Sequence, residues 1–242
     1  MKETKDLKDL KDLMTEYQLP LELHLRDDCT FESFYPGKNT HIISIIKKFI
    51  LQSGDGFIYL WGRTGVGCSH LLQASCHFAT LHQLSSVYLC LQPRLNLSIF
   101  TDLERTDLIC LDGLETIAGN ETWEEALFDL YNRVKSNGKK MMIASKQPVK
   151  GAGIQLQDLQ SRLEWGIAMQ VQPLEDDALI GALQLRAQQR GMEIHNDVAE
   201  FIIHRVARSM GQLYAILEIL DEASLRLKRK ITIPFVKKIL SL

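Results

Sequence analysis

The sequence predicts an α/β protein in which a parallel five-stranded sheet carries helices on both faces and a small helical domain follows. Two observations lead to this prediction. Between residues 40 and 173, short and nearly continuous apolar segments alternate with segments of helical periodicity, as is typical of parallel strands that are buried on both sides. Beyond Pro173, leucines and isoleucines recur at three- and four-residue steps, which indicates helices only.

Two segments precede the predicted sheet, in a tail that we place at residues 1–28. Residues 1–17 repeat Lys-Asp-Leu, and because a period of three leaves no apolar stripe on a helix, we expect a disordered or frayed tail, with a weak helix as the alternative. Leucines alternate in residues 18–25, which suits an extended segment, while Pro20 argues against a central strand. This segment is either an edge strand or linker, or a peptide that docks in a groove of another protein.

The domain with the sheet is predicted to span residues 29–173. Its strands are expected at 56–60, 87–91, 108–111, 141–144 and 167–171. A helix over 69–84 follows the first strand. Thr122-x-x-Glu125 is typical of a capping box that opens a helix to about Lys135, and Gly138 is placed to end that helix.

The second domain, residues 174–242, is predicted to be a set of helices. The first covers 175–190 and is stopped by Gly191. Asn196 is expected to N-cap the second helix, which runs to about residue 208, and a third helix covers 213–228. Pro234 suits the first position of a short final helix.

The composition is that of a soluble protein with a buried core. The chain has 242 residues, 45% of them hydrophobic, and no apolar run reaches the ~18 residues that a membrane span needs. Because the charged first residues contain no signal segment, we expect a cytoplasmic protein that binds no membrane. The cysteines form no C-x-x-C pair, so we expect buried thiols at Cys90 and Cys110 rather than a zinc site or disulfides.

The net charge of −2 argues against a protein that binds duplex DNA by itself, since such proteins carry a basic excess or a basic face. The densest basic cluster is Arg226-Leu227-Lys228-Arg229-Lys230. It lies at the end of a predicted helix, where cations suit the helix dipole. A solvated helix end is the simpler interpretation, and a DNA footprint is the alternative.

A glycine-rich loop follows the first predicted strand. A phosphate-binding loop reads G-x-x-x-x-G-K-[S/T], and here Gly62, Gly67 and Ser69 hold three of its fixed places while Cys68 stands in place of the lysine. The glycines let backbone amides surround a phosphate, but a neutral thiol cannot neutralise one. The loop therefore predicts a frame for a nucleotide without the charge that hydrolysis needs, and this mismatch favours a regulator over an enzyme.

Asp112 ends the third predicted strand, where a carboxylate can hold magnesium directly or through water. The position after it, which often carries a second acid, is Gly113, and Glu115 is a weak substitute. We expect nucleotide contacts from Gly62, Gly65, Gly67, Cys68, Ser69 and Asp112. If a magnesium nucleotide binds, Ser69 and Asp112 would hold the metal.

Several strings along the chain resemble one family. They are Thr30–Asn39, the glycine loop, Leu111–Glu115, Phe128–Arg133, Ser161–Gly166 and Ile231–Lys237. A phosphate-loop α/β domain followed by a three-helix lid is the plan of AAA+ proteins. With these strings the chain resembles the DnaA family, and more closely its Hda branch of DnaA-related regulators of bacterial replication initiation, over nearly the whole sequence from Gln18.

The resemblance assigns a role to two features that the residues alone leave open. A lone arginine is usually a surface charge, but the resemblance implies that Arg162 is an arginine finger, which stabilises the transition state on a neighbouring subunit's nucleotide. It also implies that residues 18–23 bind the sliding clamp, the β subunit of DNA polymerase III, through Gln18, Leu19, Leu21 and Leu23. The family motif has its proline later, whereas here Pro20 comes early and Glu22 interrupts the hydrophobic stretch, so we expect an altered affinity for the clamp.

The chain departs from the family in its lid as well. These proteins usually open the third lid helix with an arginine aimed at the phosphates, and Gly211 stands there. Each charge-assisted contact contributes ~1.5–3 kcal/mol, so losing both cations weakens the hold on a nucleotide. Arg63 or Arg208 is a weaker candidate to compensate. We therefore expect a loosely held ADP or other nucleoside diphosphate, with or without Mg²⁺, or no nucleotide at all.

These features lead to one function and its alternatives. The chain is expected to be a non-enzymatic inhibitor of DNA replication initiation, found at the nucleoid or replisome. With the DNA-loaded clamp it would promote hydrolysis of the ATP that DnaA binds, contacting DNA through the clamp. The alternatives are an ATPase with its own nucleotide switch, a DNA-anchoring partner, and an adaptor that resembles a helicase loader. A second copy of the chain, in a homodimer, is the alternative neighbour for Arg162.

Overall fold

The computed structural model describes residues 25–205 and 210–241. Its centre is a five-stranded sheet in the order β2-β3-β4-β1-β5, and each neighbouring pair is parallel. The strands are β1 (Gly56–Trp61), β2 (Ser86–Cys90), β3 (Leu108–Asp112), β4 (Lys140–Ser145) and β5 (Ile167–Gln170). The predicted fold class is thus confirmed.

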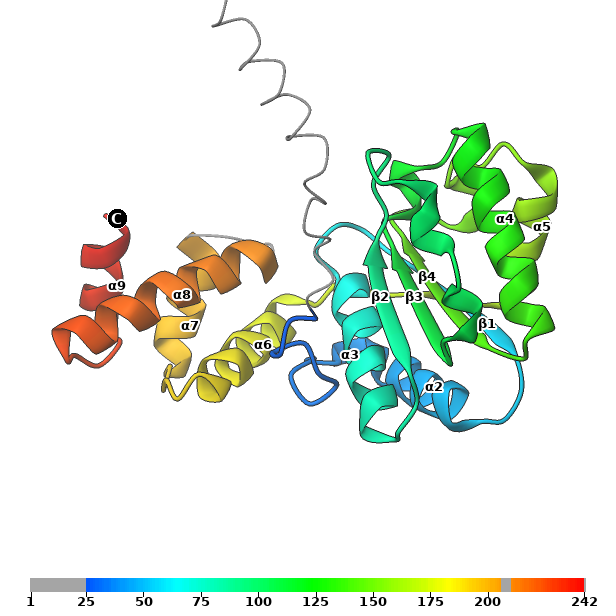
Figure 1. The fold of residues 1–242 in the computed structure, drawn as a ribbon. Helices are drawn as coiled ribbons and strands as arrows, with labels where there is room; N and C mark the ends of the chain where they lie inside the picture. The colour runs from blue at the N-terminus through cyan, green and yellow to red at the C-terminus, as the bar shows by residue number, and fades with distance from the viewer. Residues whose placement is uncertain (1–24, 206–209, 242) are drawn as a thin grey trace, which may run out of the picture.

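Helices cover both faces of the sheet (Figure 1). Helices α2 (Thr40–Leu51) and α3 (Cys68–Leu81) lie on one face, and α4 (Glu121–Ser136) and α5 (Gln157–Glu164) on the other. Alternate side chains of each strand enter two separate cores: Ile58 and Leu60 pack with α2 and α3, whereas Tyr59 packs with α4 and α5. This two-sided burial explains why the strands are almost uniformly apolar.

Short 3-10 helices connect these elements. They are η1 (Gly37–Asn39), η2 (Leu97–Phe100), η3 (Leu103–Arg105), η4 (Leu114–Thr116) and η5 (Val149–Gly151). Of these, η4 leaves the end of β3 and η5 follows β4, so both lie at the edge of the sheet where the strands end.

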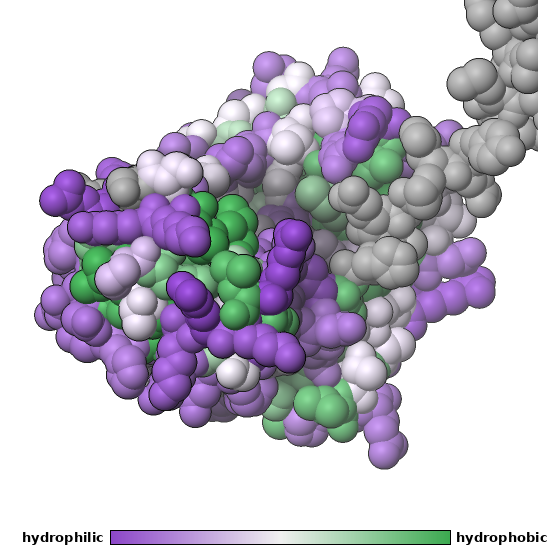
Figure 2. All heavy atoms as spheres, turned by 90° about the vertical axis from the view of Figure 1, so that its left-hand side faces the viewer, coloured by the Kyte–Doolittle hydropathy of each residue, from purple (hydrophilic) through white to green (hydrophobic). Residues whose placement is uncertain are grey.

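The lid consists of α6 (Asp176–Gln189), α7 (Asn196–Arg205), α8 (Met210–Leu227) and α9 (Ile233–Leu240). It has its own core, in which Leu183, Ile202 and Leu217 are fully buried. Thr232 caps α9 by accepting a hydrogen bond from the Phe235 amide, and Pro234 is the second residue of this helix, one position later than predicted. Figure 2 shows the lid end of the molecule, where hydrophilic side chains surround a smaller hydrophobic area.

The segment before α2 joins the two domains. Asn39, 1% exposed, exchanges two hydrogen bonds with the backbone of Gln172, at 2.9 and 2.8 Å, just before the lid begins. Lys38 forms an ion pair with Glu175 at the start of α6. The ring of Tyr35 lies so close to Gly181 of α6 that a Cβ there would stand 2.6 Å from its hydroxyl. This segment therefore fixes where the lid begins.

Three local predictions are wrong. Helix α4 is capped by Asn120, whose side chain accepts from the Trp123 amide, and not by the Thr122 box. Asn196 lies inside α7, and its amide nitrogen donates to Glu200 instead of capping the helix. Cys90 is exposed, because it ends a strand at the sheet's edge.

No helix in the described parts of the chain combines the length and apolar character that crossing a bilayer requires.

Candidate functional site

A cavity of about 350 Å³ lies where the strands end and the lid begins. The parallel register brings the last residues of β1, β4 and β5 together, with Trp61 opposite both Ser145 and Gln170. Ligands of open parallel sheets bind at this edge. The six residues predicted to contact a nucleotide all line the cavity: Gly62, Gly65, Gly67, Cys68, Ser69 and Asp112.

The glycine loop needs its glycines at two positions for different reasons. A Cβ on Gly62 would stand 2.7 Å from the carbonyl oxygen of Val171, so the backbone passes too closely for a side chain. Gly67 has φ +107°, and a Cβ there would also meet Phe34 at 2.6 Å. The first amides of α3, which begins at Cys68, have no carbonyl partner within the helix. The loop therefore presents unpaired N–H groups to the cavity, as a phosphate cradle requires.

The cysteine in this cradle is neutral at pH 7. Desolvation by burial, followed by the nearby carboxylate of Asp112, raises the pKa of the Cys68 thiol to about 12. A thiolate there would repel a phosphate, and the thiol contributes no positive charge.

Asp112 is held in place by a hydrogen bond. The hydroxyl of Tyr88 donates to one of its carboxylate oxygens at 2.8 Å. Burial and the same carboxylate raise the pKa of Tyr88, so the phenol keeps its proton. The hydrogen bond occupies one oxygen of Asp112, and the other remains to bind a metal ion or a water molecule.

Among the described residues, four cations line the cavity: Arg26, Arg63, Lys146 and Arg186. The predictions considered only Arg63 among them. Lys146 follows the last residue of β4, and its ammonium lies 3.1 Å from the carboxylate of Glu115 on η4. The sequence contained a signal for it, because residues that follow neighbouring parallel strands meet at one edge of the sheet.

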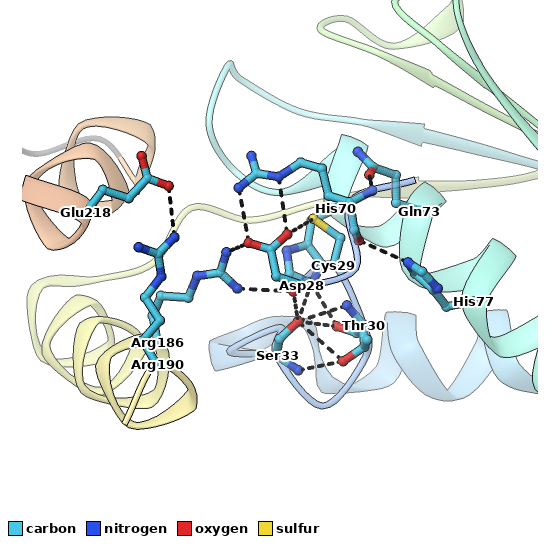
Figure 3. A network of polar contacts seen from close by, with 11 residues as sticks. Asp28, Cys29, Thr30, Ser33, His70, Gln73, His77, Arg186, Arg190 and Glu218 are labelled. Atoms are coloured by element: carbon cyan, nitrogen blue, oxygen red, sulfur yellow. Dashed lines mark hydrogen bonds and ion pairs between the residues drawn. The ribbon is translucent and has the colours of Figure 1, made fainter. Parts of the chain in front are cut away.

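Arg186 reaches the cavity from the lid helix α6. It is 3% exposed and forms an ion pair with Asp28, which Arg26 also contacts at 3.2 Å (Figure 3). Its guanidinium lies over the ring of Tyr214 at 4.9 Å, and its Nε is buried without a hydrogen-bond partner in the described structure. Nothing in the local sequence predicts this connection, since Asp28 and Arg186 are far apart in the chain.

Gly211 lies in the first turn of α8 and lines the same cavity. A Cβ built on it meets nothing within 4 Å, so a longer side chain at this position could extend into the cavity. The glycine therefore leaves open the place where the family resemblance implies an arginine. Arg208, the other candidate cation of the lid, lies outside the described residues.

Arg162 lies on α5 and is not among the residues that line this cavity. Its charge acts on Tyr131 of α4. Burial raises the pKa of this tyrosine, and the positive charge of Arg162 lowers it. Tyr131 lines a second cavity together with Asp55, just before β1 begins. Since β1 spans six residues before the glycine loop, Arg162 and the loop lie at opposite ends of the strand, on the order of 20 Å apart.

The residues around the cavity fit a phosphate-bearing ligand. The cradle opens helix α3, whose first amides have no partner within the helix, and four cations of the described chain line the cavity, although the usual lysine is absent. No cluster of three or more metal-binding side chains occurs in the described residues, so Ser69 and Asp112 would hold magnesium only together with oxygens of the ligand. Residues 1–24, which include the clamp peptide with Gln18, Leu19, Leu21 and Leu23, lie outside the described residues. The last residues of the predicted tail, 25–28, are described, and the Arg26 amide donates to the side chain of Gln73 at 2.9 Å.

Two family models match the chain. The model of the bacterial DnaA ATPase domain matches residues 25–170, and the model described as "Hda, lid domain" matches residues 176–240. Together they account for the sheet domain and the lid.

Several solved structures share the fold. Domain III of the replication initiation protein DnaA from Thermotoga maritima superposes with a TM-score of 0.74 at 20% identity, covering 92% of this chain and 98% of that one. AMPPCP-bound DnaA from Aquifex aeolicus gives 0.66 at 19% identity, over 85% and 71%. The RuvB Holliday junction branch migration motor of Thermotoga maritima gives 0.62 at 18%, over 84% and 68%. At these identities the likeness shows the fold alone.

Proposed function

Because the chain belongs to the DnaA family of AAA+ proteins and carries an Hda lid domain, we propose that it inhibits bacterial replication initiation by acting on the ATP of the initiator DnaA. In this proposal the chain is not itself the enzyme. It supplies Arg162 to a composite site on ATP-bound DnaA, and the resulting ADP form of the initiator cannot start another round.

The observation that carries the proposal is the separation of Arg162 from the chain's own cavity. The arginine and the glycine loop lie at opposite ends of β1, so the guanidinium can meet a γ-phosphate only in another subunit. A cation there stabilises charge that develops in the transition state of phosphoryl transfer.

The residues of the chain's own glycine loop also support an action on a partner's nucleotide. Cys68 is neutral and Gly211 leaves the lid without its arginine, so hydrolysis in this cavity would lack two phosphate-facing charges. A protein that works on a partner's nucleotide needs its own loop only as scaffold, or as a weak site for a diphosphate.

Recruitment would come from the sliding clamp loaded on DNA. The peptide at residues 18–23 would place Gln18 in a polar pocket of the clamp and Leu21 with Leu23 in an apolar one. Binding there would concentrate the protein next to newly replicated DNA. The chain would then contact DNA through the clamp, in keeping with its net charge of −2.

The test measures hydrolysis by ATP-bound DnaA in the presence of DNA-loaded clamp. Arg162→Ala should lose most of the stimulation, because an arginine finger contributes roughly 10³–10⁵ in rate in well-studied systems. Arg105→Ala is the matched control, since that arginine is exposed and its ion pair is with Asp102, three residues before it. Full stimulation by the Arg162 variant would refute the mechanism.

The alternative is an AAA+ adaptor or helicase-loader-like protein with its own nucleotide switch. Clamp binding separates the two functions, with wild type compared against Gln18→Ala plus Leu21→Ala. Equal clamp affinity for the two proteins would remove the link to replication control. Turnover by the isolated chain that Asp112→Ala abolishes would favour the switch.

A further inference from the structure

The cavity contains a lysine that the glycine loop does not supply. We propose that Lys146, at the exit of β4, takes the place of the missing loop lysine and binds the terminal phosphate of a nucleoside diphosphate in the chain's own cavity. The proposal concerns this chain's own ligand and does not depend on the role of Arg162.

The sheet order puts Lys146 in the right place. Strand β4 lies between β1, which leads into the glycine loop, and β3, which ends in Asp112. Its last residue, Ser145, is level with Trp61 at the end of β1, and the backbone carbonyl of Ser145 accepts the Gly62 amide at 3.1 Å. The residue that follows therefore leaves the sheet between the phosphate cradle and the carboxylate, and it lines their cavity.

Lys146 is held by a partner that a phosphate can replace. Glu115 accepts from both its ammonium, at 3.1 Å, and its backbone amide, at 3.3 Å. The lysine side chain is 55% exposed, and exposed ion pairs are weak. The long flexible stem allows the ammonium to move from Glu115 to a nearby phosphate that carries more than one negative charge, while the amide contact keeps the backbone in place.

The other cations of the cavity are less suited to this task. Arg186 is 3% exposed and paired with Asp28, so it cannot move freely, and Arg26 is held on the same carboxylate by two hydrogen bonds of 3.2 Å. Arg63 lies on the loop itself and is exposed to solvent. Among the lining cations that the structure describes, Lys146 thus combines a weak partner with a position beside the cradle.

A second observation concerns the lid side of the same cavity. The Nε of Arg186 is buried without a hydrogen-bond partner among the described residues, which is rare in folded proteins. Arg186 lines the cavity from the lid helix α6, opposite the base domain that carries the glycine loop. A cavity of about 350 Å³ that is lined by both the loop and the lid has room for a nucleoside as well as its phosphates.

The test is the affinity of the full chain for ADP with Mg²⁺, measured by calorimetry. Lys146→Ala should weaken binding about 10- to 100-fold, as expected for loss of one charge-assisted contact. Lys150→Ala is the matched control, because that lysine is exposed on η5 and does not line the cavity. Unchanged affinity in Lys146→Ala, or no binding by wild type at millimolar ADP, would overturn the proposal.

A double variant tests the replacement itself. Cys68→Lys restores a lysine to the loop, so it should recover ADP binding in the Lys146→Ala background. If the double variant is folded by circular dichroism and still does not bind ADP, Lys146 does not replace the loop lysine.

Two further probes identify the contacted group. Pyrophosphate should lose affinity in Lys146→Ala as ADP does, whereas adenosine should bind both proteins equally. A loss that is as large for adenosine would overturn the assignment of Lys146 to phosphate. Binding of pyrophosphate as tight as that of ADP would overturn the nucleoside part.

Discussion

Replacing Glu124 with alanine should destabilise the protein through the loop that leads to Arg162. Glu124 lies in α4 and is 1% exposed. Its carboxylate accepts backbone N–H groups of Gly119 at 2.6 Å, Leu156 at 2.7 Å and Gln155 at 3.0 Å. The last two residues directly precede α5, which begins at Gln157. One buried side chain therefore fixes the approach to the helix that carries the proposed finger.

The expected loss of stability follows from these three hydrogen bonds. Hydrogen bonds to a charged group contribute ~1.5–3 kcal/mol each, but Gly119 and Gln155 are exposed residues whose amides can bind water instead. We therefore expect a loss of about 3 kcal/mol in the free energy of unfolding for Glu124→Ala. Glu124→Gln keeps the volume and one acceptor oxygen, so it should lose about half as much.

Urea unfolding followed by tryptophan fluorescence measures this loss, since Trp123 is buried next to the changed residue. Glu125→Ala is the control on the same helix. Its side chain is exposed, and such surface substitutions change stability by at most about 0.5 kcal/mol. If the Glu124 and Glu125 variants unfold at the same urea concentration, the carboxylate does not organise this loop and the reasoning fails.

Two more predictions concern buried and half-buried charges. Asp28→Asn should destabilise the protein more than Arg186→Met does. The first substitution leaves Arg186, which is 3% exposed, without a carboxylate partner, whereas the second leaves Asp28 paired with Arg26. Equal free energies of unfolding in urea for the two variants would contradict this order. Hydrogen bonds from Lys139 and a nearby serine lower the pKa of Asp107 to about 2. In the unfolded chain the pKa of an aspartate is ~3.9. The ionised Asp107 therefore stabilises the folded state, by about 1 kcal/mol after allowance for screening by solvent. This stabilisation is complete above pH ~4 and is lost as the pH falls toward 2. Wild type and Asp107→Asn should therefore differ in stability at pH 7 and converge near pH 2, and a gap that stays constant with pH would refute the assignment.

The sheet and the glycine loop could be predicted because their signals are local. A strand buried on both faces is an apolar run wherever it lies in the sequence, and the loop's glycines follow from backbone geometry at fixed spacing. The cap of α4 was misjudged although its signal is also local: Asn120 and Thr122 are both good capping residues, and only the folded backbone shows which of them reaches an amide.

The cations of the cavity could not be predicted in the same way. Lys146 lies 78 positions beyond Cys68 in the printed numbering, and the two share a cavity only because β4 is placed between β1 and β3. Arg186 depends on how the lid is docked, through contacts with Asp28 and Tyr214. Sequence patterns describe which residues share a face, but not which faces meet.

By itself, then, the sequence determined the α/β class, the helical lid and a phosphate loop without its lysine, since each depends on residues that are close in the chain. The tertiary structure decided that the loop faces other cations, that Glu124 holds the approach to α5, and that Arg162 lies at the far end of β1 from the chain's own cavity. These are relations between distant segments, and their energies come from burial and charge pairing that exist only once the chain has folded.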